Sequence, residues 1–162
     1  MIYDYRDKEG YVSLWIGKCS NYSVLDHYLS TVYMDENVEP YKELRNIFIP
    51  ANKGRPCEEE LKNAFSNEYY NQFEYDFGLS FDKDFCDAHV LDNYTSNLEE
   101  LFDGFSYCDT FVDEAKTLSN TQLPECNTAF ALYDFKYCGD ILESKHENVS
   151  MYFLGYVKYS KK

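Results

Sequence analysis

Residues 11–17, Tyr-Val-Ser-Leu-Trp-Ile-Gly, constrain the fold of this chain more than any other segment. Successive side chains of a strand point to opposite faces. Apolar residues would occupy both faces here, with Val12, Leu14 and Ile16 on one and Tyr11 and Trp15 on the other. A strand that is apolar on both faces belongs in the middle of a sheet, with layers packed above and below. We therefore predict a central strand that Gly17 ends.

Two patterns after this strand predict amphipathic helices. Apolar residues recur every four positions between residues 24 and 33, after the candidate N-cap Ser23, and favour a helix of about three turns. Pro56 and three glutamates then open a second pattern that Gly78 ends, which predicts a helix over residues 58–77. Its apolar positions are Leu61, Phe65, Tyr69, Phe73 and Phe77.

Two segments outside these helices are expected to be irregular. Residues 1–10 form a polar lead-in, and residues 35–56, which contain several Pro and Gly, form a long surface connection.

Strand and helix patterns both occur in the second half of the chain. Residues 79–85 favour an extended segment, and Ser96 and Ser106 are candidate N-caps of two helices that end near Phe105 and Leu118.

The last two strands are the clearest of this half. The apolar run 129–135 predicts a central strand and residues 151–159 a final one, paired with it as a long hairpin across a polar loop at 138–148. The sum is an α+β fold in one domain spanning residues 1–162, as the length suggests. We expect about four strands in a mostly antiparallel sheet, with about four helices packed on it.

Negative charge is concentrated between residues 82 and 114. The whole chain has a formal net charge of −14, and this segment holds ten of its 29 acidic residues. Such a block repels the phosphates of nucleic acids and membranes and would steer a basic partner, so we expect neither a nucleic acid nor a membrane as partner. A solvated surface that keeps the protein dissolved explains the same charge equally well.

The six cysteines match no zinc-binding spacing. We identify no export signal and no membrane-spanning run, so we expect reduced thiols in a cytoplasmic protein. We expect no cofactor and no metal.

The acids around Asp82 are the one group that resembles a metal site. Asp82 and Asp84 could bind a hard cation and His89 could add a nitrogen ligand, but the spacing matches no calcium loop. A small metal-dependent hydrolase is therefore an alternative function. No Ser or Cys lies in a Gly-flanked nucleophile motif, and we expect that the protein is not an enzyme.

Five short motifs occur in an order that resembles a known family. They are Val12-Ser13-Leu14-Trp15-Ile16-Gly17, Tyr75-Asp76-Phe77-Gly78, Asp82-Lys83-Asp84-Phe85, Ser106-Tyr107-Cys108-Asp109-Thr110-Phe111 and Phe153-Leu154-Gly155. This set resembles the immunity protein 22 family of bacterial polymorphic toxin systems. The resemblance implies a small cytoplasmic protein that binds and neutralises a cognate toxin, with no catalytic residues to carry over. The long connection at 35–56 is a place where we expect the chain to depart from the family pattern.

Acidic residues and tyrosines supply the candidate binding surface. Protein interfaces use Tyr as anchors, although Tyr133 fits a core position equally well. We expect a basic toxin, such as a nuclease, to be held by stoichiometric binding; a binding module unrelated to toxins is a further alternative. The candidate partner-binding residues are Asp82, Asp84, Asp87, Asp92, Glu99, Glu100, Asp103, Tyr94 and Tyr107.

Overall fold

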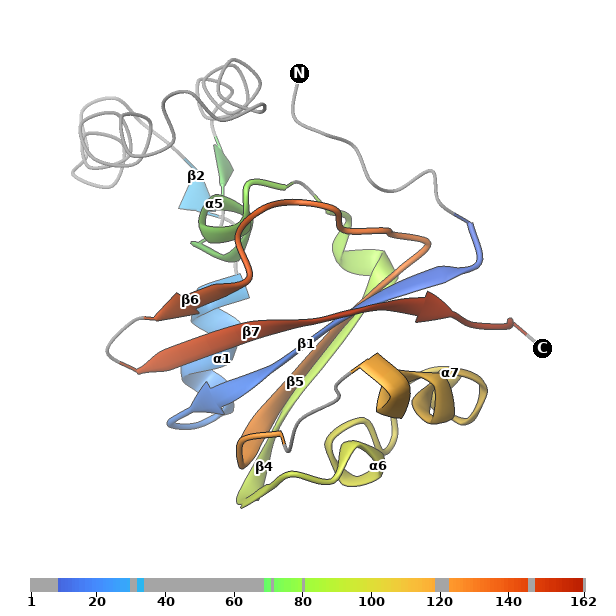
Figure 1. The fold of residues 1–162 in the computed structure, drawn as a ribbon. Coiled ribbons are helices and arrows are strands. Elements are labelled where there is room, and N and C mark those ends of the chain that lie inside the picture. The colour runs from blue at the N-terminus through green and yellow to red at the C-terminus, as the bar shows by residue number, and fades with distance from the viewer. Residues whose placement is uncertain are drawn as a thin grey trace.

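A computed structural model describes residues 9–29, 32–33, 69–70, 72–79, 81–118, 123–145 and 148–161. These residues form an α+β fold around a five-stranded antiparallel sheet in the order β4-β5-β1-β7-β6 (Figure 1). Its strands are β1 (Tyr11–Cys19), β4 (Cys86–Thr95), β5 (Cys126–Tyr133), β6 (Glu143–Lys145) and β7 (Val149–Lys158). The sheet therefore has one strand more than the sequence predicts.

Helices cover both faces of the sheet (Figure 1). The described helices are α1 (Tyr22–Leu29), α5 (Gln72–Phe77), α6 (Leu98–Leu101) and α7 (Cys108–Ala115), with 3-10 turns η2 (Lys83–Phe85) and η3 (Lys116–Leu118). α6 and α7 pack on one face, and α1 and α5 pack on the other. A second, two-stranded sheet pairs β2 (Val32–Tyr33) with β3 (Tyr69–Tyr70).

The prediction for the first strand is confirmed. β1 lies in the middle of the sheet and pairs with β5 on one side and β7 on the other. Val12, Leu14 and Ile16 belong to the apolar cluster under α6 and α7. Trp15 belongs to the opposite cluster, and its side chain is 0% exposed. β1 thus joins the two halves of the core.

Gly17 has a different role from the one that the sequence suggests. The strand continues past it to Cys19, so Gly17 does not end β1. A Cβ atom built at Gly17 would lie 1.9 Å from the carbonyl oxygen of Ser150 in β7. Glycine is required here because the neighbouring backbone comes too close for any side chain.

The predicted hairpin between the last two strands is wrong. β5 and β7 do not pair, because β1 lies between them and bonds to both. β1 is apolar on both faces, so it buries the most apolar surface in the centre of the sheet. It therefore takes the place beside β5 that the sequence predicts for β7. Part of the expected polar loop, Glu143–Lys145, forms β6 beside β7.

The first predicted helix is too long, and a strand interrupts the second. α1 ends at Leu29, and Val32–Tyr33 is a strand. Within 58–77, Tyr69–Tyr70 is also a strand, so only Gln72–Phe77 is helical among the described residues of that range. Aromatic and β-branched residues favour strands, and at these positions that preference outweighs the four-residue period. Gly78 does end α5, with φ 68° and its N–H donating to the Glu74 carbonyl at 2.9 Å.

The sequence pattern does not predict β4. The expected extended segment at 79–85 contains the turn η2, and the strand begins only at Cys86. β4 lies at an edge of the sheet, and polar residues interrupt its alternation. The helix caps also shift by one residue, from Ser96 to Asn97 for α6 and from Ser106 to Tyr107 for α7.

Several predictions fall on residues outside the described part. They concern the lead-in before residue 9, the connection at 35–56 and the start of the helix predicted over 58–77. The described cysteines, all except Cys57, are free thiols. Among the described residues, no helix has the length and apolar character needed to cross a membrane.

Candidate functional site

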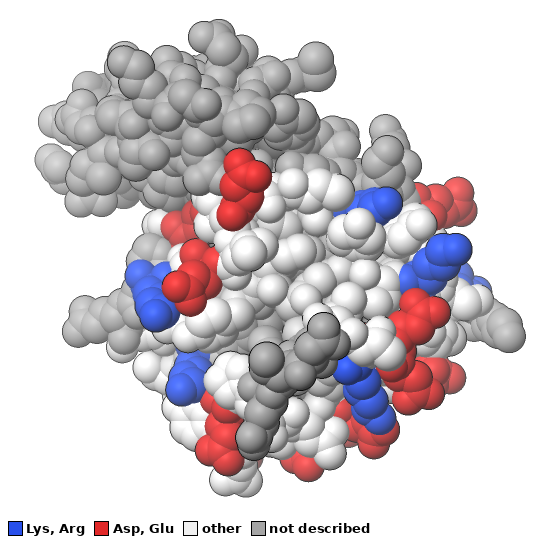
Figure 2. Space-filling model, in the orientation of Figure 1, with Lys and Arg blue, Asp and Glu red and all other residues white. Residues whose placement is uncertain are grey.

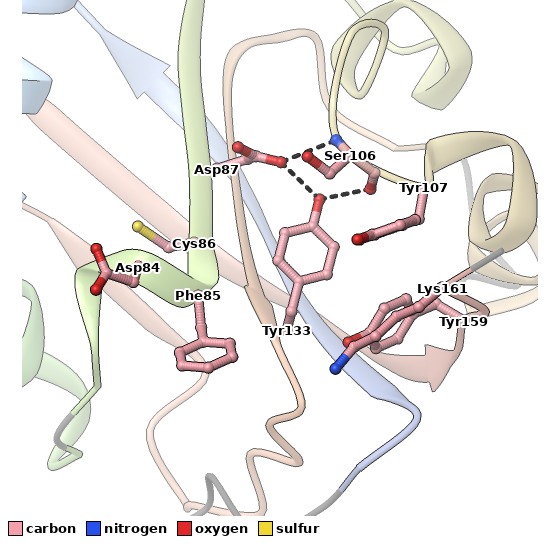
Figure 3. A pocket seen from close by; sticks show the side chains of 9 residues that line it. All are labelled: Asp84, Phe85, Cys86, Asp87, Ser106, Tyr107, Tyr133, Tyr159 and Lys161. Atoms are coloured by element: carbon pink, nitrogen blue, oxygen red, sulfur yellow. Dashed lines mark hydrogen bonds between the residues drawn. The ribbon is translucent and has the colours of Figure 1, made fainter.

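A pocket of about 260 Å³ opens where β4 begins and β5 and β7 end (Figure 3). Residues from four separate segments line it, namely Asp84, Phe85, Cys86, Asp87, Ser106, Tyr107, Tyr133, Tyr159 and Lys161. The start of β1 brings two of these segments together. Val12 pairs with Tyr133, and the Gly10 carbonyl accepts a hydrogen bond from the Tyr159 N–H at 3.0 Å.

Asp87 and Tyr133 form the back of the pocket. The Tyr133 hydroxyl lies 2.8 Å from Asp87 Oδ2 and 2.8 Å from the Ser106 carbonyl oxygen, and Asp87 Oδ2 also accepts the Ser106 N–H at 2.9 Å (Figure 3). Burial, together with the bonded Asp87 carboxylate, raises the pKa of Tyr133 well above its ordinary value. Tyr133 therefore remains a protonated donor at neutral pH and fixes the segment before α7 to β4.

Tyr107 stands at the N-terminal end of α7 in a left-handed backbone conformation, with φ 61° and ψ 19°. Its ring centroid lies 5.9 Å from that of Tyr133 and 5.6 Å from that of Tyr159. A residue with a Cβ atom pays a steric cost in this conformation, and bulky residues adopt it rarely. The fold therefore holds the Tyr107 ring against the pocket at a cost in backbone energy.

Asp134 is the second described non-glycine residue with positive φ, at 54°. Its carboxylate accepts hydrogen bonds from the Gly10 N–H at 3.0 Å, the Tyr159 hydroxyl at 2.7 Å and the Lys161 ammonium at 2.5 Å. It thereby holds two of the lining residues in place. Backbone strain concentrates at functional sites, and in the described chain both such residues flank this pocket.

The pKa of Asp134 predicts a pH dependence. Burial by itself would raise this pKa, but the hydrogen bonds from Lys161, Tyr159 and the Gly10 amide outweigh it and hold the pKa below its ordinary value. A carboxyl whose pKa is depressed by folding contributes stability above its unfolded pKa of about 3.9 and loses it as pH falls through the folded pKa.

Asp134→Asn should therefore lower the free energy of unfolding at about pH 7 and have a smaller effect at about pH 3. Asn tolerates the left-handed conformation, so the substitution adds little strain. Urea unfolding of both proteins at the two pH values measures the difference, and an effect of equal size at both would contradict the role given to the charge.

The structure divides the predicted binding residues into two groups. Asp84, Asp87 and Tyr107 converge on the pocket, while Asp82 caps η2 by accepting the Asp84 N–H at 2.9 Å. The second group lies on the far half of β4 and on or just after α6, with every member exposed: Asp92, Tyr94, Glu99, Glu100 and Asp103. The predicted residues therefore do not form one continuous cluster.

Sequence reasoning missed Phe85, Tyr159 and Lys161. Lys161 pairs with Asp134 and lies 6.0 Å from the centroid of the Tyr159 ring. Tyr133 is both a core residue, 7% exposed, and a wall of the pocket. These contacts join segments far apart in the chain, and no local pattern reports them.

Basic residues interrupt the acidic surface. Lys116 pairs with Glu99 and also lies 3.6 Å from an Asp113 carboxylate oxygen. Figure 2 shows acidic side chains gathered beside lysines on the side where α7 lies in Figure 1, while the middle of that face is mostly uncharged. Glu99, one of the acids predicted to meet a partner, is therefore already paired within the protein.

His89 does not join the acids around Asp82. Its Nε2 contacts the Leu101 carbonyl oxygen, and its ring packs edge-on against Phe105 with centroids 4.7 Å apart. Among the residues that the structure describes, no three His, Cys, Asp or Glu side chains are grouped so that they could hold a metal ion.

A family model described as Immunity protein 22 matches residues 12–160, nearly the whole chain. The chain belongs to the immunity protein 22 family. Comparisons with curated proteins and with solved structures gave no match.

The motifs that carry the resemblance have defined places in this immunity protein 22 fold. Residues 12–17 lie in β1, 75–78 end α5 and 153–155 lie in β7. The other two border the pocket: residues 82–85 contribute Asp84 and Phe85, and residues 106–111 contribute Ser106 and Tyr107. The family resemblance therefore covers both the scaffold and the candidate site.

Proposed function

We propose that this protein neutralises a cognate bacterial toxin in the cytoplasm by binding it stoichiometrically, with no chemistry of its own. Membership of the immunity protein 22 family over residues 12–160 is the observation that carries the proposal. The binding surface comprises the pocket together with the exposed acidic residues of β4 and α6.

Charge supports a basic partner for this surface. Asp92, Glu100 and Asp103 are exposed, and the segment 82–114 holds one basic residue against ten acidic ones. Complementary charge raises the rate of association and opposes wrong partners. Proteins that act on nucleic acids carry basic surfaces, so a nuclease is a toxin of suitable charge.

Exposed aromatic side chains support binding in both parts of this proposed surface. Tyr94 on β4 is 55% exposed and Phe85 beside the pocket is 45% exposed. Buried aromatic anchors supply much of the binding energy of protein interfaces. Steering by the acids and anchoring by the rings would together give fast and long-lived inhibition.

Charge reversal tests the surface. Asp92→Lys with Glu100→Lys should slow association with the cognate toxin domain by roughly tenfold at low salt, because steering depends on local charge. The dissociation rate should change less. Surface plasmon resonance over a series of salt concentrations measures both rates.

A matched control has the same change in net charge elsewhere. Asp140→Lys with Glu143→Lys alters β6 and the residues just before it, at the opposite edge of the sheet from β4 (Figure 1). An equal slowing in both variants would show that net charge alone matters and would contradict the assigned surface. No slowing in the first variant would contradict it too.

A further inference from the structure

The pocket exposes aromatic rings that the core does not need. Phe85 and Tyr107, at 45% and 37% exposed, lie on opposite sides of the Tyr133 ring in Figure 3, with Tyr159 beside Tyr107. A hydrophobic core would cover such rings. Here four rings surround a space of about 260 Å³, below the roughly 300–1,000 Å³ typical of small-molecule sites. The space suits one inserted side chain better than a cofactor.

The strain at Tyr107 indicates that its ring is needed for something other than folding. Glycine adopts φ 61° without steric cost. Tyr107 caps no backbone group with its side chain, and its ring is partly exposed at the pocket. Its ring contacts are to Tyr133 and Tyr159, which themselves line the pocket, and backbone strain of this kind clusters at functional sites.

The charges favour a cation in the pocket. Both hydrogen bonds to Asp87 fall on Oδ2, so Oδ1 can accept from a ligand. Asp84 adds an exposed carboxylate at the side. The ammonium of Lys161 does not cancel these charges, because Asp134 neutralises it at 2.5 Å. Its place 6.0 Å from the Tyr159 centroid also shows that this ring accepts a cation as neighbour.

We propose that the pocket receives an arginine side chain of the toxin and is the anchor of the complex, an inference that rests on the proposed function. The planar guanidinium can stack on a tyrosine ring while it donates to a carboxylate such as Asp87. An ammonium would satisfy the charge without the stacking. The acids on β4 and α6 steer the toxin, and the pocket slows its release.

Tyr107→Gly separates this role from folding. The substitution relieves the backbone strain but loses the ring contacts with Tyr133 and Tyr159; these effects oppose each other, so resistance to urea should change little. Affinity for the cognate toxin domain should fall by about tenfold or more, mainly through faster dissociation. Tyr22→Ala, an exposed tyrosine in α1, is the matched control and should leave affinity unchanged.

A direct probe tests the chemistry of the occupant. Acetyl-arginine methylamide, titrated at millimolar concentration, should shift the NMR ring signals of Tyr107, Tyr133 and Tyr159 in a saturable way. The neutral isostere acetyl-citrulline methylamide should shift them much less. Equal shifts from both, no shift from arginine, or stronger binding of the norleucine analogue would overturn the assignment to arginine.

The two proposals fail in different ways. If the toxin binds the unchanged protein and binds Tyr107→Gly equally well, the anchor is wrong and the proposed function stands. If the toxin does not bind the unchanged protein, both proposals fall.

Discussion

Trp15→Ala is expected to lower the free energy of unfolding by about 3–5 kcal/mol, the range for truncating a large buried aromatic residue. Trp15 is 0% exposed, and its ring centroid lies 5.0 Å from those of both Phe73 and Phe153. Alanine would leave a cavity between β1 and the layer of α1 and α5. Urea denaturation followed by circular dichroism measures the loss.

Trp15→Phe is the matched variant. The buried indole Nε1 has no hydrogen-bond partner among the described residues, and an unsatisfied buried donor carries a desolvation cost. Phenylalanine keeps most of the ring and removes that donor, so its loss should be clearly smaller than that of alanine. If Trp15→Ala cost less than about 1 kcal/mol, the central place given to β1 would be wrong.

Gly17→Ala is the second large effect. The new Cβ would meet Ser150 O at 1.9 Å, Ser150 C at 2.9 Å and Met151 Cα at 3.1 Å, all backbone atoms of β7. Backbone in the middle of a sheet cannot move aside as a flexible side chain can. The substitution should therefore cost at least the roughly 1–3 kcal/mol of ordinary overpacking.

Lys18→Ala provides the control for Gly17. Lys18 is the next residue of β1, is exposed and also pairs with the Ser150 region of β7, so its effect should stay within about 0.5 kcal/mol. Thermal unfolding of both variants gives the comparison. An equally mild effect at Gly17 would show that β1 and β7 are not in close contact there.

The core strands were predictable because their apolar residues mark them directly. Apolar residues on both faces predict β1, and a continuous apolar run predicts β5. Pairing was not predictable, since any of these strands could have taken the central place. β4 stayed hidden because Asp87, His89 and Asp92 interrupt its pattern, although His89 and Leu91 contact the core side.

The candidate site was predictable only in part. The distribution of charge along the sequence indicated the acidic segment. Three of the partner-binding residues predicted there, Asp84, Asp87 and Tyr107, line the pocket. The left-handed backbone at Tyr107 and Asp134 depends on tertiary contacts, so no local pattern indicates it. The hydrogen bond between Tyr159 and Asp134 joins the residue after β7 to the residue after β5. It depends on the pairing of both strands with β1, which the sequence does not indicate.

The most direct test of the account is a titration of the cognate toxin domain with the purified protein. We predict that calorimetry finds one complex of fixed stoichiometry, that toxin activity falls to zero at the same ratio, and that affinity weakens as salt is raised. Full toxin activity in the presence of excess protein would contradict the account.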